Sequence, residues 1–255
     1  LRLNLMRRDE GSWRSTPATG AEPEIHREGV GLSLVTGLYT GNELTFNHYY
    51  LKTDDNADYG IRFDSNTRRP TRDFAADTFW GTDDHFDRSE THISSLVHQF
   101  RISPWAELRT QLRYARYERD YWAAAPMTTA PSIDGVLGGS NKTRTAETEN
   151  LTLQSDLPAR ADLFGMRHEL LAGFEYLKEA ATRQALLNIG TASRPYYSAS
   201  LRAGSPITYQ GDTLAFYLQD TIEFVPDWKL TLGARRDTLD AEYSSLTSPQ
   251  HDFSE

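Results

Sequence analysis

The strongest candidates for chemistry in this sequence are four residues close together near its middle: Tyr117, Arg119, Tyr121 and Trp122. A guanidinium group beside aromatic rings can attract a negatively charged group, and the rings can stack on a flat one. The same residue types also form aromatic girdles and structural ion pairs, and Glu118 and Asp120 lie between them in the sequence as possible ion-pair partners. The spacing alone leaves both interpretations open.

Two further sets of rings and arginines lie in segments without a periodic pattern. They are Arg68, Arg69, Phe79 and Trp80 in one segment, and Tyr196 and Tyr197 in another. Binding residues are common in loops that a rigid scaffold positions. The same rings could equally pack loops against one another, so both uses stay open.

Searches for metal and catalytic motifs give no prediction of a cofactor or an active site. The acidic run 54–58 begins like a calcium loop, but Tyr59 stands where glycine is needed and Ser65 where glutamate is needed. The sequence contains no Gly-x-Ser-x-Gly, P-loop or His-Glu-x-x-His motif. We therefore predict no metal site and no catalytic residue.

Alternation of apolar and polar residues at period two runs through almost the whole chain and predicts β-strands. In the clearest example Leu112 lies on the apolar face and Arg113 on the charged face. Continued alternation puts Tyr117, Arg119 and Tyr121 on the face of Arg113. About nine such strands, a number estimated from this pattern, predict an all-β antiparallel fold.

The connections alternate between tight turns and long polar segments. The tight ones are 37–42, 103–105, 158–165 and 225–228, and the long ones are roughly 9–28, 54–86, 123–144 and 183–211. Short periplasmic turns and long extracellular loops are typical of transmembrane β-barrels of the outer membrane. A soluble β-sandwich or adhesin-like binding module is the alternative, in which the apolar stripe would form a packed core.

Composition narrows the class of protein. The chain has 255 residues, 38% of them hydrophobic, and its apolar runs fall far short of the ~18 residues of a spanning helix. A net charge of -9 argues against a nucleic-acid partner, and the absence of cysteine excludes disulfides and thiolate metal sites. The aromatic content of 11% suits strands and the interfacial girdles of a barrel.

Several stretches resemble the central part of the β-barrel of TonB-dependent siderophore receptors. Residues 216–220 followed by 228–235 look like the recurring strand, tight turn and strand of that family. Residues 112–120 resemble a strand that rises into a long outer loop, and 168–176 resemble the strand that comes soon afterwards. The likeness covers nearly the whole chain and depends on the order and spacing of these stretches.

The resemblance implies a plugged barrel of about 22 strands in the bacterial outer membrane. Such a receptor takes up ferric siderophores with energy from the TonB-ExbB-ExbD complex, so iron is cargo and no cofactor is needed. Residues 1–255 would then be part of the barrel domain, without the plug domain and the C-terminal barrel strands, in contact with outer-membrane lipid and lipopolysaccharide. We expect no enzyme activity, although an outer-membrane barrel enzyme stays a further alternative. The implied ligand-binding residues are Tyr117, Arg119, Tyr121, Trp122, Phe79, Trp80, Arg68, Arg69, Tyr196 and Tyr197.

Overall fold

The computed structural model describes most of the chain. The described residues are 1–17, 19–64, 66–72, 74–81, 83–126, 132–133, 136–137, 139–188, 201–245 and 248–254. They contain no helix that is long and apolar enough to cross a membrane.

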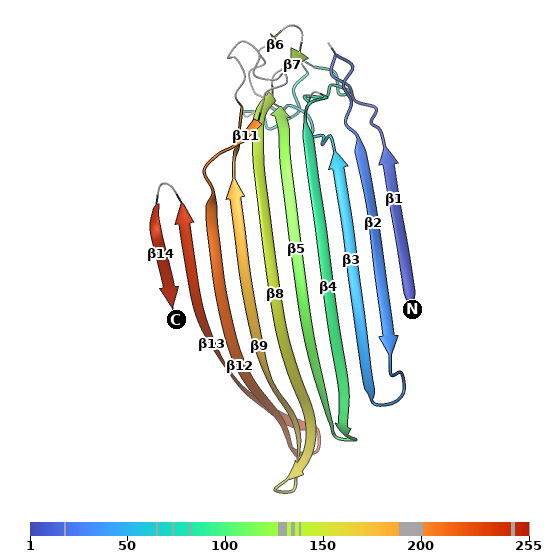
Figure 1. Cartoon of the computed structure of the whole chain (residues 1–255), viewed down its shortest axis with the longest axis vertical. Helices are drawn as coiled ribbons and strands as arrows, with labels where there is room; N and C mark the ends of the chain where they lie inside the picture. The colour runs from blue at the N-terminus through green and yellow to red at the C-terminus, as the bar shows by residue number, and fades with distance from the viewer. Residues whose placement is uncertain are drawn as a thin grey trace.

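A single antiparallel sheet of ten strands dominates the structure, and each strand pairs with the next one of the sheet along the chain (Figure 1). The strands are β1 (Arg2–Glu10), β2 (Ile25–Thr36), β3 (Asn42–Asp55), β4 (Phe86–Ser103), β5 (Ala106–Pro126), β8 (Gly139–Leu163), β9 (Met166–Gln184), β12 (Ile207–Val225), β13 (Trp228–Ser245) and β14 (Ser248–Ser254). Two small hairpins lie between these strands: β6 (Ser132–Ile133) with β7 (Val136–Leu137), and β10 (Leu186–Asn188) with β11 (Leu201–Ala203). The nine expected strands are confirmed, and the short β14 is a tenth that the sequence pattern did not reveal.

The alternation of short turns and long connections is confirmed from β1 to β13, and the four expected short turns of that stretch lie at one end of the sheet (Figure 1). The turn between β2 and β3 depends on Gly37, whose φ is 75° and where an added Cβ would lie 2.0 Å from the carbonyl oxygen of Asn42. The expected turn at 158–165 is wrong in its extent, because β8 continues to Leu163 and only Phe164 and Gly165 form the turn. Pro158 stays inside the strand at a point where the pairing with β5 is interrupted, so its missing N–H breaks no bond of that ladder.

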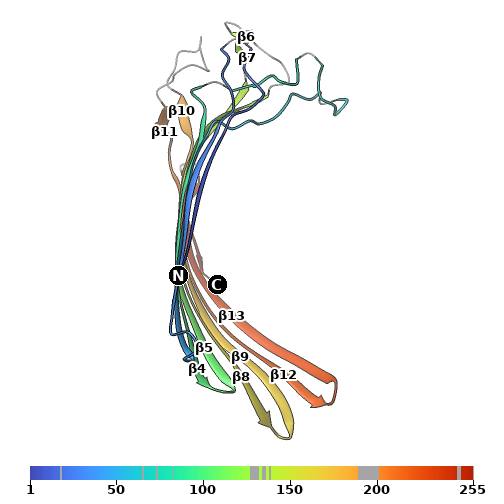
Figure 2. The ribbon, with the colours of Figure 1, turned by 90° about the vertical axis from the view of Figure 1, so that its right-hand side faces the viewer.

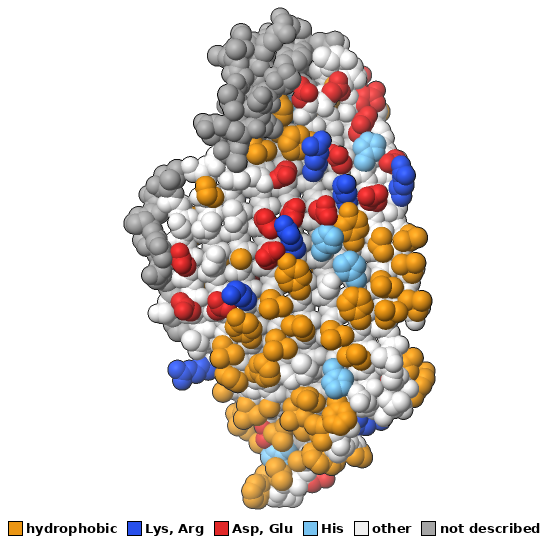
Figure 3. Space-filling model, in the orientation of Figure 1, with side chains coloured by type: hydrophobic (Ala, Val, Ile, Leu, Met, Phe, Trp, Pro, Cys, Tyr) orange, Lys and Arg blue, Asp and Glu red, His pale blue; other side chains and the backbone are white. Residues whose placement is uncertain are grey.

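The sheet is curved, and the connections between β1 and β2 and between β3 and β4 lean toward its concave side (Figure 2). On the convex side, hydrophobic side chains gather over the half nearer the short turns, while acidic and basic ones gather nearer the long connections (Figure 3). One apolar row runs straight across seven strands through paired residues: Leu34, Phe46, Leu96, Leu112, Leu153, Tyr176 and Leu214.

Within the described part of the chain, no protein segment covers this apolar face. Leu96 is 41% exposed and Leu112 is 44% exposed, and the buried apolar residues of the sheet itself are mostly alanines. A soluble sandwich would bury this row in a core, so that alternative fails. Strands of 21 residues (β5) and 25 residues (β8) are also longer than the roughly 9–11 residues that cross a bilayer. They therefore reach well beyond an apolar band facing lipid.

Candidate functional site

The candidate site lies on the concave face where β4 and β5 run into the long connections. Arg119 on β5 donates from Nε and Nη2 to the two carboxylate oxygens of Asp87 on β4, at 2.8 and 2.6 Å. Its guanidinium also lies 4.9 Å from the centre of the Tyr121 ring. The bidentate hydrogen bond with Asp87 fixes the plane of the Arg119 guanidinium, and the cation–π contact then orients the Tyr121 ring.

Tyr117 lies lower on the same face of β5. Its hydroxyl accepts a hydrogen bond of 2.9 Å from Nη2 of Arg113, four residues away along the strand. Because side chains at even spacing along a strand share a face, Arg113, Tyr117, Arg119 and Tyr121 form one column. The expected sharing of a face by Tyr117, Arg119 and Tyr121 is confirmed.

A residue that the sequence pattern did not single out joins this column from the connection between β3 and β4. Tyr59 lies close enough to Asp87, Arg119 and Tyr121 for their charges to act on it. Desolvation raises the pKa of the Tyr59 hydroxyl, and the Asp87 carboxylate adds to the effect. A tyrosine hydroxyl is protonated at pH 7 even at its ordinary pKa, so Tyr59 is able to donate a hydrogen bond at the edge of the column. No periodic signal marks Tyr59, because it lies outside the strands.

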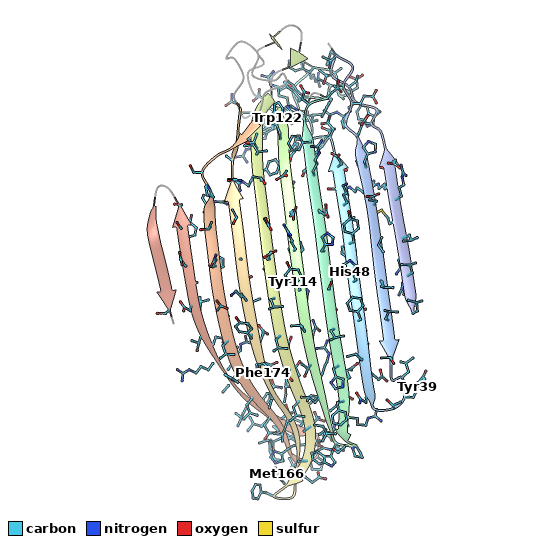
Figure 4. All side chains as sticks on the ribbon, viewed as in Figure 1. Tyr39, His48, Tyr114, Trp122, Met166 and Phe174 are labelled. Carbon is cyan, nitrogen blue, oxygen red and sulfur yellow. The ribbon has the colours of Figure 1, made fainter. Side chains whose placement is uncertain are left out.

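The structure separates Trp122 from the other three residues of its set. It follows Tyr121 directly, so it points to the opposite face of β5, at the loop end of the strand (Figure 4). The side chain is only 3% exposed and meets the ring of His85 edge-on, with ring centres 4.9 Å apart. Burial lowers the pKa of His85 to about 4, so this histidine is neutral at pH 7. Trp122 and His85 thus pack the β3–β4 connection against the sheet.

Phe79 and Trp80 are buried within the long connections, at 1% and 3% exposure. Trp80 meets the ring of Phe74 edge-on at 5.0 Å, and the hydroxyl of Thr16 donates to the carbonyl oxygens of Phe79 and Gly81. These contacts join the β1–β2 connection to the β3–β4 connection. The two rings pack the loops together, and a ligand would reach them only if the loops opened.

Arg68 and Arg69 lie instead at the exposed tip of the β3–β4 connection. Asp64 begins this tip, and its Oδ1 accepts the backbone N–H groups of Asn66 and Thr67 at 2.7 and 3.0 Å. The tip is remote in sequence from the column on β5, and among the described residues no hydrogen bond or ion pair joins Arg68 or Arg69 to that column. Tyr196 and Tyr197 lie outside the described part of the chain.

The acidic run 54–58 is neutralised by arginines from three different segments. Asp54 pairs with Arg88 at 2.8 Å and Asp55 with Arg27 at 2.6 Å. The carboxylate of Asp58 pairs at 2.5 Å with an arginine of the β1–β2 connection. Across the residues that the structure describes, no group of three potential metal ligands converges. Paired carboxylates are what an acidic structural loop requires, and they do not form a calcium cage.

A second polar cluster on the concave face joins strands β8, β9, β12 and β13. The Tyr217 hydroxyl donates to the Asp156 carboxylate, and the guanidinium of Arg235 lies 5.5 Å from the centre of the Tyr217 ring. Gly173 makes room for this ring, because an added Cβ would lie 2.5 Å from two of its carbon atoms. Sequence reasoning missed the cluster. The alternation places each residue on this face, but only the register between strands brings them together.

Comparison with known proteins agrees with this geometry. The family described as "TonB dependent receptor-like, beta-barrel" matches residues 30–254, which is most of the chain. The chain belongs to the TonB-dependent receptor β-barrel family. The expected resemblance is therefore confirmed, and so is the expected location in the bacterial outer membrane.

Relatives of this TonB-dependent receptor chain include two named siderophore receptors. The "Catecholate siderophore receptor Fiu" of Escherichia coli O6:H1 is 28% identical over 249 residues, covering 87% of this chain and 33% of the relative. The "Probable TonB-dependent siderophore receptor PiuA" of Acinetobacter baumannii is 24% identical over 258 residues, covering 88% and 35%. The chain thus spans about a third of the length of these relatives.

Solved receptor structures share the fold. The siderophore receptor PiuA from Acinetobacter baumannii superposes with a TM-score of 0.78 and 21% identity, over 99% of this chain and 41% of that one. The ferric-catecholate import receptor Fiu from E. coli K12, in its open form, gives 0.75 and 21% over 99% and 44%. In this receptor family the concave face is the lumen wall, the short turns are periplasmic and the long connections are extracellular. The column on β5 therefore lies at the extracellular end of the lumen.

Proposed function

We propose that this chain forms part of the wall of an outer-membrane transporter that takes up ferric siderophores in a TonB-dependent manner. Its family membership carries the proposal, and its relatives are named as siderophore receptors. Energy would come from the TonB-ExbB-ExbD complex through the plug of the receptor. Iron is the cargo inside the chelate, and we propose no cofactor.

The column on β5 is the proposed ligand contact. A ferric siderophore is large, often anionic, and carries aromatic or amide faces, so rings and guanidinium groups suit it. Arg119 is already bonded to Asp87, which leaves it to orient the Tyr121 ring. The rings of Tyr117 and Tyr121 would then supply the stacking surface toward the lumen.

Relatives of this chain are named as receptors rather than enzymes. We extend this to the chain itself and propose that it catalyses no reaction. A test is the incubation of the receptor with ferric chelates, followed by mass spectrometry of the chelate. An unaltered chelate supports transport alone, and a hydrolysed one would support the outer-membrane enzyme.

We further propose that the charged part of the convex face contacts the headgroups of outer-membrane lipid and lipopolysaccharide. Arg116 lies there among the carboxylates of Glu118 and Glu147, at 2.6 and 2.8 Å. The hydroxyl of Tyr114 donates to Glu149 at 2.9 Å. The boundary between water and lipid favours a tyrosine such as Tyr114, whose ring faces lipid and whose hydroxyl is bonded to a charged residue.

The ligand contact can be tested with two matched pairs of substitutions on one strand. Tyr117→Ala with Arg119→Ala removes a ring and a cation from the lumen face of β5, and Tyr114→Ala with Arg116→Ala does the same on the convex face. We expect the first pair to weaken ferric siderophore binding by about 1–3 kcal/mol, the usual cost of losing anchor residues, and the second to leave it unchanged. Equal affinity of both variants, with normal assembly in the membrane, would refute the assigned site.

A further inference from the structure

The periplasmic end of the wall has a step beside the β4–β5 turn. The pairing of β5 with β8 ends at Ala106 and Ala159, whereas β8 continues to Leu163. Residues 160–163 pair with β9 alone, so their other edge is free. The β8–β9 hairpin therefore extends past the β4–β5 turn (Figure 1).

Two neighbouring hollows of about 430 and 400 Å³ occupy this step. Trp105 and Arg160 line both of them, and the Arg160 N–H donates to the Trp105 carbonyl oxygen at 2.8 Å in the corner of the step. The lining also includes Ala159 and Ala161 from the convex face and Arg167 from the concave face. The space thus opens around the free edge of β8, where a ligand lying on the lipid-facing side comes within reach of long side chains from the lumen side.

The lipid-facing part of the step is apolar and is formed by small side chains. Ala159 pairs with Ala106 on one side and with Leu170 on the other, and Ala161 follows it on the same face. Trp105 is 59% exposed beside these alanines. An indole ring at the boundary of water and lipid packs against acyl chains while its N–H reaches water. The alanine floor beside this ring suits an acyl chain.

The polar part of the step carries charges of both signs. Six ionisable side chains line the two hollows: Arg101, Arg160, Arg167, Glu107, Asp162 and Glu169. All except Glu107 are exposed, and none of the six forms an ion pair within the part of the chain that the structure describes. Three cations and three anions are complementary to a headgroup that itself carries both charges, and less so to a simple anion.

We propose that this step is a binding site for phosphatidylethanolamine of the periplasmic leaflet. The short turns of this receptor family are periplasmic, and that leaflet of the outer membrane consists of glycerophospholipids. The guanidinium groups of Arg160 and Arg167 would hold the phosphate, the Asp162 carboxylate would accept from the ammonium group, and the alanine floor would take an acyl chain. The bound lipid would cover the free edge of β8. The site is separate from the column on β5 and does not depend on the cargo.

The test measures the affinity of the full-length, delipidated receptor for its first bound lipid by native mass spectrometry in detergent. The probes are phosphatidylethanolamine, phosphatidylglycerol, which lacks the ammonium group, and phosphatidylcholine, whose cation has no N–H donor, all with the same acyl chains. Arg160→Gln removes a phosphate contact and Asp162→Asn removes the ammonium contact. The matched controls are Lys229→Gln and Asp227→Asn, which change exposed residues at the β12–β13 turn, outside the step. Unchanged heat-modifiable mobility in gels shows that each variant has assembled.

We expect the wild type to bind phosphatidylethanolamine about tenfold more tightly than the other two lipids. Arg160→Gln should weaken binding of phosphatidylethanolamine about tenfold, and Asp162→Asn should abolish the preference for it over phosphatidylglycerol. Both controls should bind like the wild type. Equal affinity of the wild type for the three lipids, wild-type binding by Arg160→Gln, a preference that survives Asp162→Asn, or an equal loss in the controls would overturn the inference. Iron uptake plays no part in this measurement, so its outcome leaves the proposed function untouched.

Discussion

Removal of the Arg14 side chain should release the extracellular loops without disturbing the barrel wall. Arg14 forms one ion pair with Asp58 and donates to the carbonyl oxygens of Gly60 and Thr78. Breaking a fully buried pair by deleting one partner costs about 3–5 kcal/mol. Here Asp58 keeps 27% side-chain exposure and can regain water, so the Arg14→Ala substitution should cost about 2–4 kcal/mol of loop stability.

Hydrogen exchange followed by mass spectrometry measures this loss directly. The informative amides are those of Ser15 and Phe79, which bond to the carbonyl oxygens of Asp77 and Ser15 across the two connections. Since about 1.4 kcal/mol corresponds to a factor of ten, their exchange should accelerate roughly 30- to 1,000-fold. Amides in the middle of β5 and β8 should keep their wild-type rates.

The control is Arg69→Ala, which removes an exposed arginine from the β3–β4 connection, the one that Arg14 contacts. It should change exchange of the same amides by less than about threefold, as expected of an exposed side chain away from packed features. Exchange of the Phe79 amide that is equally slow in wild type and Arg14→Ala would refute the view that Arg14 clamps the loops.

Two further predictions concern packing and pH. Gly173→Ala should destabilise the barrel by about 1–3 kcal/mol, seen as a lower midpoint of urea unfolding in lipid vesicles, because the new Cβ would displace the Tyr217 ring. Gly233→Ala, where the nearest atom would be 3.5 Å away, is the matched control and should be nearly neutral. The pKa of His85 is about 4 in the folded protein, below the ordinary value of 6.5. The free energy that the neutral, buried imidazole contributes to loop stability is therefore fully present above pH 6.5 and is lost as the pH falls toward 4. The free energy of loop opening in the wild type should therefore be about 1 kcal/mol lower near pH 5.5 than at pH 7, and proteases should cleave the loops faster at the lower pH. A His85→Gln variant that shows the same pH dependence of cleavage would contradict this.

The sheet could be predicted from the sequence because each strand carries its own signal. Alternation around Leu112 and Arg113 marks both the strand and its two faces, and a tight turn such as 103–105 marks where it reverses. Pro158 shows the limit of such signals. Read alone it indicates a turn, but two neighbouring strands pair around it and extend β8 to Leu163.

The site could be predicted only in part, for a related reason. Tyr117, Arg119 and Tyr121 share a strand, so period two places them together. Trp122 is adjacent to Tyr121 in sequence, so the same period places it on the opposite face of the strand. Phe79 and Trp80 carry no period at all, and their burial depends on Thr16 and Arg14 from a connection more than sixty residues away. Contacts at such separation have no local signature.

The most direct test of the central claim is uptake of radiolabelled iron by cells. The full-length receptor would be expressed in an iron-starved bacterium that lacks its own siderophore receptors, with and without a working TonB protein. We predict accumulation of iron from at least one ferric siderophore, abolished when TonB is absent. Iron accumulation that is the same without TonB, or none from any ferric siderophore by a well-assembled receptor, would contradict the account.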